Sequence, residues 1–561
     1  MSAAPEQPQQ YANSACSSHV WSQLLPELAE KIVGCLDPNE VPSFRLVNKA
    51  AAAQFRAPRH TTYRLSQPVP PHVFAAHWLA PGITRGLTLH RRWQLLSLTA
   101  ASGVVANLEL GVQAAGCLLT PEVLEAAAGA GQLDSCIWLW EHGCPTGEYP
   151  FKPSSLLAAA ASGGHRHVCE WLLGQGLTGH SNGAVEAARG GHVGLMEWLL
   201  QRRPALNVET YPEHETPRLV AGVAHGCDLP TLQRLWRRWG EVTEWAKATA
   251  LEAAAGSPTP DWAAKVEWLE AQGCPRSSPW PAAECPDAVA RLAWLRARGF
   301  PFELSLANIA AKTGNVVAVQ YLLGEAGVQL SSYDAVSVVA GPAAGFGHLA
   351  VLQALHGGGW SSHAAGGWPR NIIADCARTA ASHGHLHVLT WLVGTFGAEA
   401  VGMDPSLFKE AAFSGSVDLM TWLQERGCGW SREALTAAAC SGCEEAVEWL
   451  VAQGCPVEDG YPSLILACRN GDLAMAQLLR QLGAPWGPAG SVVSDAAERS
   501  PLPMLRWLLQ EGCPLGDYDA AWKAAAERVS GRQEALELLE AHRQAQEREA
   551  FLIEGAAGGV I

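Results

Sequence analysis

A short pattern recurs along most of this chain and limits what the chain can fold into. A run of small residues is followed by a glycine and, seven residues after that glycine, by a tryptophan and a leucine. A unit of this size cannot bury an apolar face alone, so tandem copies must stack on one another. The pattern therefore predicts one long stacked array. Its complete instances pair Gly131 with Trp138, Gly164 with Trp171, Gly191 with Trp198, Gly384 with Trp391, Gly415 with Trp422, and Gly442 with Trp449.

Each unit reads as two helices joined by a turn. The first half is rich in alanine, the strongest helix former, as in LLAAAASGG (156–164). The glycine suits the left-handed geometry that ends a helix. The second half has apolar residues at i, i+3 and i+4, as in HVCEWLLGQG (167–176), and often ends in the helix-stop signal Gly-Cys-Pro. We therefore predict an all-α helix–turn–helix solenoid of about fifteen repeats over residues 95–541.

The tryptophans fall into two groups. Nine share one position of the second helix, and this sharing predicts that they pack in the core between repeats. Three others, Trp360, Trp430 and Trp486, follow the glycine that ends a second helix. Exposed there, they would be candidates for binding a target; the alternative is that they fold back over the next repeat. The nine are Trp138, Trp171, Trp198, Trp268, Trp294, Trp391, Trp422, Trp449 and Trp507.

The repeat pattern resembles the ankyrin repeat. The pairs Gly164-His165, Gly191-His192, Gly347-His348 and Gly384-His385 match the Gly-His between the two helices of that family. The opening Thr-Pro-Leu-His of the family is absent, and several units are shorter than its repeats. This tryptophan-rich, Cys-Pro-connected form is similar to ankyrin arrays of algae and protists. The resemblance implies a solenoid that binds other proteins along its concave face.

Residues 19–57 do not fit the repeat and resemble an F-box. The matching residues share the family's spacing of apolar, proline and acidic positions. Two departures are Pro42, inside the expected second helix, and an alanine run in place of a tryptophan. We expect residues 1–18 to be disordered, residues 58–94 to link this module to the array, and residues 542–561 to form a tail. The matches are Leu25, Pro26, Glu27, Leu28, Ile32, Leu36, Asp37, Pro38, Glu40, Val41, Leu46, Val47, Asn48 and Lys49.

The F-box resemblance implies a substrate receptor of a cullin–RING ubiquitin ligase of the SCF type. Its apolar surface would dock a Skp-type adaptor, while the repeats hold the target. The alternative is an ankyrin scaffold without a ligase role, whose N-terminal helices only cap the array. The resemblance assigns adaptor binding to Leu25, Pro26, Leu28, Ile32, Leu36, Val41 and Val47.

No chemistry is predicted for the chain. Cys440 and Cys443 have zinc-type spacing, but both fall on repeat positions, and His383, His385 and His387 do not share a helix face. Phosphate-loop, nucleophile-elbow and zinc-protease motifs are missing from the sequence. We therefore expect no catalytic, cofactor-binding or metal site, and no enzyme activity.

Charge and composition bound the partners and the compartment. The chain has 54 acidic and 39 basic residues, a net charge of −15, which argues against binding nucleic acid. We find neither a secretory signal nor a run of apolar residues long enough to span a membrane. We expect a monomer in the cytoplasm or the nucleus, with protein partners, and the identity of the target stays open.

Overall fold

The structure is a computed structural model of the 561-residue chain. It describes residues 26–46, 49–146, 155–177, 180–202, 212–328, 333–358, 368–457, 460–528 and 530–557. Every regular element in these ranges is a helix, and none of them holds a strand. The predicted all-α repeat solenoid is therefore confirmed.

The chain begins with a few short helices and continues as helix pairs. The N-terminal elements are α2 (Pro26–Gly34), α3 (Val41–Arg45), α4 (Lys49–Gln54), the 3-10 turn η1 (Pro58–His60) and α5 (Pro71–Trp78). The first pairs are α6 (Leu89–Ala101) with α7 (Val105–Ala115), α8 (Pro121–Gly129) with α9 (Leu133–Glu141), α10 (Ser155–Ser162) with α11 (Arg166–Gly174), α12 (His180–Arg189) with α13 (Val193–Arg202), and α14 (Pro212–Gly226) with α15 (Leu229–Trp239). The next are α16 (Glu244–Ala255) with α17 (Trp262–Ala271), the 3-10 turn η2 (Trp280–Glu284) with α18 (Ala288–Ala297), α19 (Leu304–Lys312) with α20 (Val316–Gln320) and the π turn η3 (Tyr321–Glu325), α21 (Tyr333–Gly345) with α22 (Leu349–Gly357), and α23 (Arg370–Ser382) with α24 (Leu386–Phe396). After the short α25 (Ala398–Val401) come α26 (Pro405–Phe413) with α27 (Val417–Glu425), α28 (Glu433–Ser441) with α29 (Glu444–Ala452), α30 (Tyr461–Arg469) with α31 (Leu473–Gln481), α32 (Ser491–Arg499) with α33 (Leu502–Gln510), and α34 (Tyr518–Ala526) with α35 (Arg532–Ala557).

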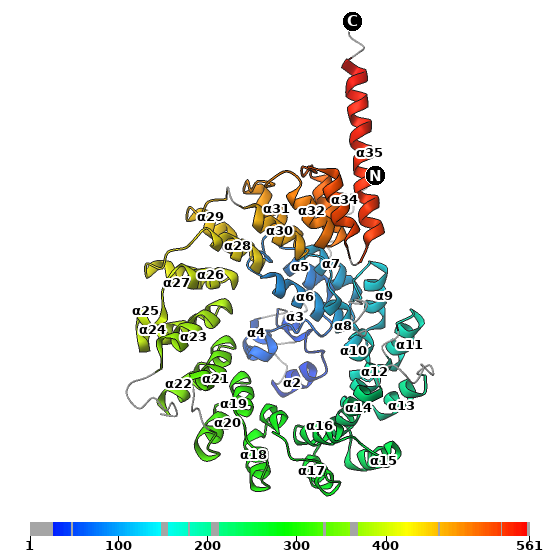
Figure 1. The fold of residues 1–561 in the computed structure, drawn as a ribbon, viewed down its shortest axis with the longest axis vertical. Helices are drawn as coiled ribbons and strands as arrows, with labels where there is room; N and C mark the ends of the chain where they lie inside the picture. The colour runs from blue at the N-terminus through cyan, green and yellow to red at the C-terminus, as the bar shows by residue number, and fades with distance from the viewer. Residues whose placement is uncertain are drawn as a thin grey trace, which may run out of the picture.

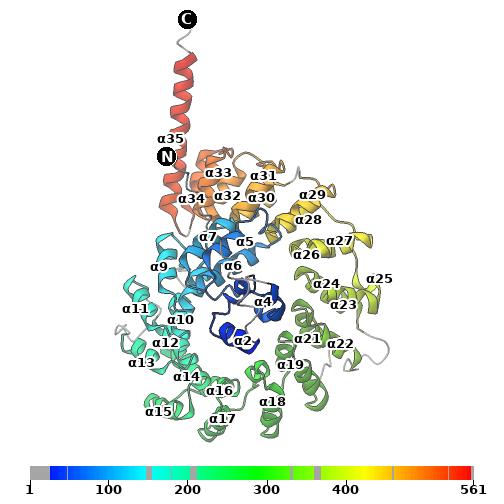
Figure 2. The same ribbon diagram turned by 180° about the vertical axis from the view of Figure 1, so that it is seen from behind.

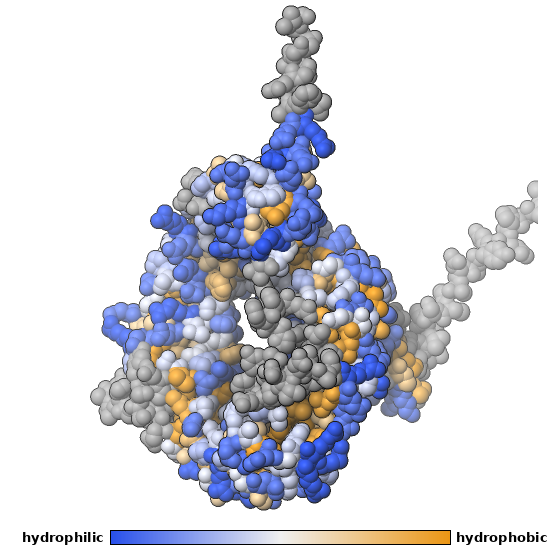
Figure 3. Space-filling view, turned by 45° about the vertical axis from the view of Figure 1, so that its right-hand side comes forward, coloured by the Kyte–Doolittle hydropathy of each residue, from blue (hydrophilic) through white to orange (hydrophobic). Residues whose placement is uncertain are grey.

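The pairs are arranged in a ring. Successive first helices stack on one another, for example α10 on α12 and α12 on α14. In Figures 1 and 2 these first helices form the inner wall of the ring, and the second helices form its outer wall. The space-filling view shows the molecule hollowed at its centre (Figure 3). The array therefore curves until it meets itself, instead of extending as an open superhelix.

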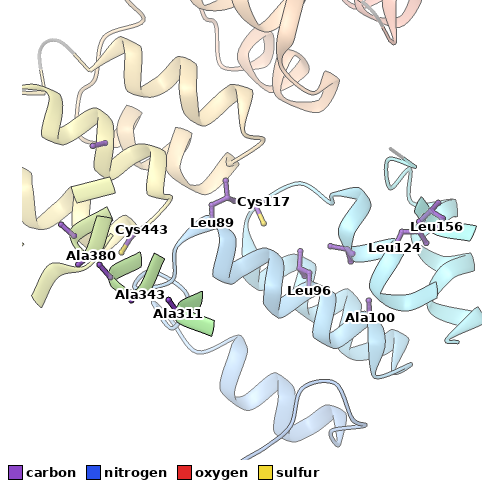
Figure 4. Close-up of a cluster of buried hydrophobic side chains, with 14 of the residues drawn as sticks. Leu89, Leu96, Ala100, Cys117, Leu124, Leu156, Ala311, Ala343, Ala380 and Cys443 are labelled. Carbon is purple, nitrogen blue, oxygen red and sulfur yellow. The ribbon is translucent and has the colours of Figure 1, made fainter. Parts of the chain in front are cut away.

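Small residues on the first helices let the repeats approach closely. Ala311, Ala343 and Ala380 are buried near the C-terminal ends of α19, α21 and α23 and lie in one row (Figure 4). Alanine combines high helix propensity with little bulk, so neighbouring helices pack backbone to backbone. The continuous core runs through all the repeats as a single cluster.

The tryptophans predicted for the core lie at its edge. All nine are half-buried and pack against the core from one side. The leucine that follows each of them, such as Leu172 after Trp171, is fully buried. Adjacent helix positions are rotated by about 100°, so only one of the two can face the centre of the stack. Several of the tryptophans stack under arginines at the outer surface, as Trp422 does under Arg426.

Histidines of the Gly-His pairs connect successive repeats. The ring of His348 donates from Nε2 to the carbonyl of Lys312 (2.9 Å), and His385 donates to Gly345 (2.8 Å). Both carbonyls stand at the end of the preceding first helix, where no backbone partner remains for them. Each histidine thus caps the helix of the repeat before it.

In repeats without such a histidine, buried lysine or arginine side chains cap the first helix of the preceding repeat. The ammonium of Lys265 donates to the carbonyls of Ala224 (2.7 Å) and Cys227 (2.8 Å), one repeat back. Arg291 and Arg528 make equivalent bonds to the ends of α16 and α32. A charge can be buried at these places because it is hydrogen-bonded to several carbonyl dipoles. Burial lowers the pKa of Lys265 to about 8.

The ring closes by contacts between its first repeat and repeats far along the chain. We call this junction the seam; it joins residues 85–118 to residues 442–474. The backbone N–H of Leu118 donates to the carbonyl of Gly471 (3.0 Å), and a reciprocal bond joins Ala474 to Gly116 (2.9 Å). In Figure 4, Leu89 and Cys117 lie beside the α28–α31 segment.

A buried ion pair lies at the centre of the seam. The guanidinium of Arg92 donates to both carboxylate oxygens of Asp472, at 3.0 and 2.5 Å, and each side chain is only 1% exposed. Arg92 also donates to the carbonyls of Ala115 (2.8 Å) and Gly442 (2.9 Å). The guanidinium is therefore bonded to groups from both sides of the seam.

Beyond the seam the array continues as an overhang. Helices α32–α35 stack onto α30 and leave the ring, and α35 projects from it (Figures 1 and 2). Ala535 and Leu539 bury one face of α35, whereas residues 543–548 are exposed. Hydrophilic side chains cover the surface where α35 emerges (Figure 3). The helix extends to Ala557, well into the segment that was expected to form a tail.

The N-terminal helices form a small module with its own core. Val33 and Val41 pack with Phe55, apart from the core of the array. The second helix of the module begins at Val41. Pro42 thus stands in a first helical turn, where its missing N–H breaks no bond. Viewed along the ring axis, α2–α4 lie within the outline of the ring (Figures 1 and 2).

Candidate protein-binding surfaces

The helix α2 presents an apolar pair to solvent. Leu28 and Ile32 are 46% and 40% exposed, while Ala29 and Val33, one position after each, are buried in the module. Positions i and i+4 share a helix face, so the two exposed side chains form one continuous patch. An apolar pair displayed at helical spacing in this way can serve as a docking surface.

The other residues that the F-box resemblance assigned to adaptor binding are placed differently. Leu36 is half-buried, and Val41, which is 5% exposed, packs inside the module. Val41 packs with Ala29 and Val33 on the buried face of α2, opposite the exposed pair. Pro26 begins α2. Leu25 and Val47 lie outside the described residues.

Asn39 anchors the module, and sequence reasoning did not single it out. Its amide nitrogen donates to the carbonyls of Arg64 (2.8 Å), Gln67 (3.1 Å) and Pro68 (3.0 Å), and its amide oxygen accepts from the N–H of Arg64 (2.7 Å). The side chain is 1% exposed. Its hydrogen-bond partners lie in an irregular part of the linker, which has no sequence signal, so the role of Asn39 as an anchor is seen only in the structure.

A cleft opens on the inner wall between α26, α28 and α30. It has a volume of about 630 Å³, and Lys409, Phe413, Thr436, Cys440 and Leu466 contribute to its lining. Phe413 is 48% exposed. An apolar floor with a few polar groups at its edge is typical of a site that receives side chains of another molecule.

Two of the tryptophans predicted to bind a target pack against the array. Trp430 is half-buried and lies 5.8 Å, centroid to centroid, from Phe408. Trp486 is half-buried as well; it packs near Trp507, and Arg480 stacks over its ring at 3.9 Å. Both side chains are thus packed as the alternative interpretation expects, folded back over a neighbouring repeat. Trp360 lies outside the described residues.

The cysteines and histidines that were considered as metal ligands occupy positions in the packing of the repeats. Cys443 points its Sγ toward the carbonyl of Arg85 (3.6 Å), while Cys440 is half-buried in the inner-wall cleft. Burial raises the pKa of both thiols. His385 and His387 donate to carbonyls of the preceding repeat. The described residues contain no group of three or more side chains that could hold a metal ion.

Comparison with known proteins supports the repeat class over part of the chain. A family model for ankyrin repeats (3 copies) matches residues 407–486. Ankyrin repeats are protein-binding modules, which indicates a role in binding proteins. No match to a curated protein was found. Among solved structures, the pentatricopeptide repeat protein PPR10 from maize matches with 14% identity and a TM-score of 0.25, covering 94% of this chain and 74% of that one.

Within the described ranges, each helix is too short or too polar to cross a membrane.

Proposed function

We propose that this chain is a substrate receptor of a cullin–RING ubiquitin ligase, in which the N-terminal module docks a Skp-type adaptor and the ring of repeats holds the target. The observation that carries the proposal is the exposed pair Leu28 and Ile32 on α2, at positions where the F-box-like motif places adaptor contacts. The receptor performs no chemistry. It raises the concentration of the target near the conjugating enzyme, in the cytoplasm or the nucleus.

The packing of the linker favours this proposal over the scaffold alternative. A chain whose N-terminal helices only cap the array should bury α2 against the first repeat. Instead, Val69 and Phe74 cover that repeat by packing on Leu95, and Asn107 donates to the carbonyl of Val69 (2.8 Å). Because the linker and α5 supply the cap, closing the array does not require the apolar pair on α2.

The inner wall is the surface we propose for the target. The cleft between α26, α28 and α30 lies within the segment that matches the ankyrin-repeat model. The module and the wall belong to one chain, so an adaptor bound to α2 and a target bound to the wall would be held in one complex. Bringing the two together in this way is what a ligase receptor has to provide.

The first test is binding of the full chain to a purified Skp-type adaptor by calorimetry. Leu28→Asp with Ile32→Asp places two charges in the proposed contact, and we expect the affinity to fall at least about a hundredfold. The matched control exchanges two exposed charges on the same helix, Glu27→Lys with Lys31→Glu, and should change the affinity by no more than about twofold. Absence of binding by the unaltered chain, or equal binding by the aspartate variant, would refute the ligase role.

A further inference from the structure

We propose that the seam is a latch, at which the ring opens and recloses while the repeats themselves stay folded. This inference does not depend on the ligase role, because it concerns contacts within the chain. It rests on three features of the seam: what it buries, how its charges are held and how closely its two sides fit.

Helices pack against one another much less across the seam than at the joints between neighbouring repeats. Inside the array, each first helix packs on the next, and second-helix leucines such as Leu172 and Leu392 are fully buried in the core between repeats. At the seam the contacts come from helix ends and the turns beside them, and Leu89 and Cys117 are buried there on the side of the first repeat. Since apolar burial is the main source of cohesion, the ring should part first at the seam.

The central ion pair determines which residues meet when the ring closes, but it adds little to the free energy that holds the ring closed. Arg92 and Asp472 lose their hydration when the ring closes, and their attraction roughly compensates for that loss. When the ring opens, both charges return to water, so separating them as hydrated ions is not strongly opposed. Removing one partner from the closed ring is different, because it leaves the other charge buried and unpaired.

A second set of charges lies at the edge of the seam. Arg85 forms ion pairs with Glu444 (3.4 Å) and Glu448, and its side chain is 39% exposed. The N–H of Glu445 donates to the carbonyl of Arg85 (3.2 Å). Partly exposed pairs of this kind are screened by salt, so the rim of the seam is held by reversible contacts.

The two sides nevertheless fit closely enough to define a single closed state. Gly442 has a φ of +76°, and a Cβ at this position would lie 2.5 Å from the Cβ of Leu89. A side chain there would collide with the first repeat. The close fit gives the seam specificity, and the sparse packing of helices across it gives it reversibility, which together are the properties of a latch.

The experiment measures opening directly on the full chain by hydrogen exchange. The amides of Leu118, Ala474 and Glu445 donate across the seam, so they exchange when the ring opens. The variant Asp472→Asn removes the charge, but asparagine can still accept the α31 capping bond that Asp472 takes from Met475. We expect these three amides to exchange at least about tenfold faster in the variant. We also expect a larger radius of gyration and unchanged helical circular dichroism.

The matched control is Asp228→Asn. Asp228 caps the second helix α15 through the same i to i+3 bond, to the N–H of Thr231, but it is exposed and lies outside the seam. This variant should leave exchange at the seam unchanged. A milder variant, Arg85→Gln, tests the rim of the seam without disturbing a buried residue and should accelerate exchange by a smaller factor.

The latch predicts that, even in the unaltered protein, seam amides exchange faster than core amides of the same class, such as the N–H of Cys144 that bonds to Leu139. Equal rates for the two classes, unchanged by Asp472→Asn and by Arg85→Gln, would overturn the proposal and make the ring one permanent unit. Loss of helical structure in Asp472→Asn together with unchanged seam exchange in Arg85→Gln would overturn it as well.

Discussion

At the scale of single residues, a glycine and a histidine from neighbouring repeats form one joint. Gly164 ends a first helix with a φ of +77°, and His192 of the next repeat lies over it. The glycine thus meets two demands, a left-handed backbone and space for an imidazole. The sequence pattern identified the first demand, because it is local. It could not identify the second, because the histidine comes from the following unit.

Gly164→Ala should destabilise the protein by roughly 2–4 kcal/mol. The added Cβ is strained at positive φ and would lie 2.5 Å from the His192 ring. The control is Gly174→Ala in α11, which meets no atom within 4 Å and should stabilise by about 0.5–1 kcal/mol. Urea unfolding measures both, and equal stabilities for the two variants would contradict the joint.

The buried Lys265 should make stability depend on pH in the alkaline range. Its pKa in the folded protein is about 8, below the ordinary value of 10.5, because burial disfavours the charged form. Between these two values the unfolded chain binds more protons than the folded one, so stability from this residue rises with pH. The unfolding free energy of the unaltered protein should therefore increase, relative to that of Lys265→Met, by on the order of 3 kcal/mol from pH 8 to 10.5. A difference that stays constant across this range would show that the ammonium is not strained by burial.

At the scale of elements, most helices could be predicted because their signals are local. Alanine runs, glycine stops and the spacing of Trp-Leu pairs place the helices of the array. For the residues that the F-box resemblance assigned to adaptor binding, exposure was predicted only in part. Leu28 and Ile32 are exposed, but Val41 turns inward because α3 packs on α2 and against Phe55. That packing depends on tertiary contacts, which helical periodicity alone does not reveal.

Asn39→Ala should release the module from the linker. The change removes four hydrogen bonds to residues 64–68, each contributing about 0.5–1.5 kcal/mol, so local opening should become easier by roughly 2–4 kcal/mol. Faster hydrogen exchange in α2 and α3, with the array unchanged, is the expected result. Asn308→Ala serves as a comparison, since its amide donates to the carbonyl of Val338 within the array. If the two variants affect α2 equally, Asn39 is not the anchor.

At the scale of the whole molecule, ring closure was beyond sequence reasoning. Arg92 and Asp472 are 380 positions apart, and each sits in a segment that reads as an ordinary repeat. The small rotation between neighbouring repeats decides whether an array closes, and no motif encodes it. The sequence therefore predicted a solenoid but not its ring.

A closed ring also constrains how this chain can change over evolutionary time. A linear repeat protein can gain or lose whole units by duplication and deletion, since each unit needs only its two neighbours. Here every repeat from α8 to α29 contributes part of one full rotation. The rotations add up to a closed circle only with the present number of repeats. Losing one of them would leave Arg92 facing the wrong repeat. Change in length is then confined to the overhang, α32–α35, where units can be added or removed without breaking the circle.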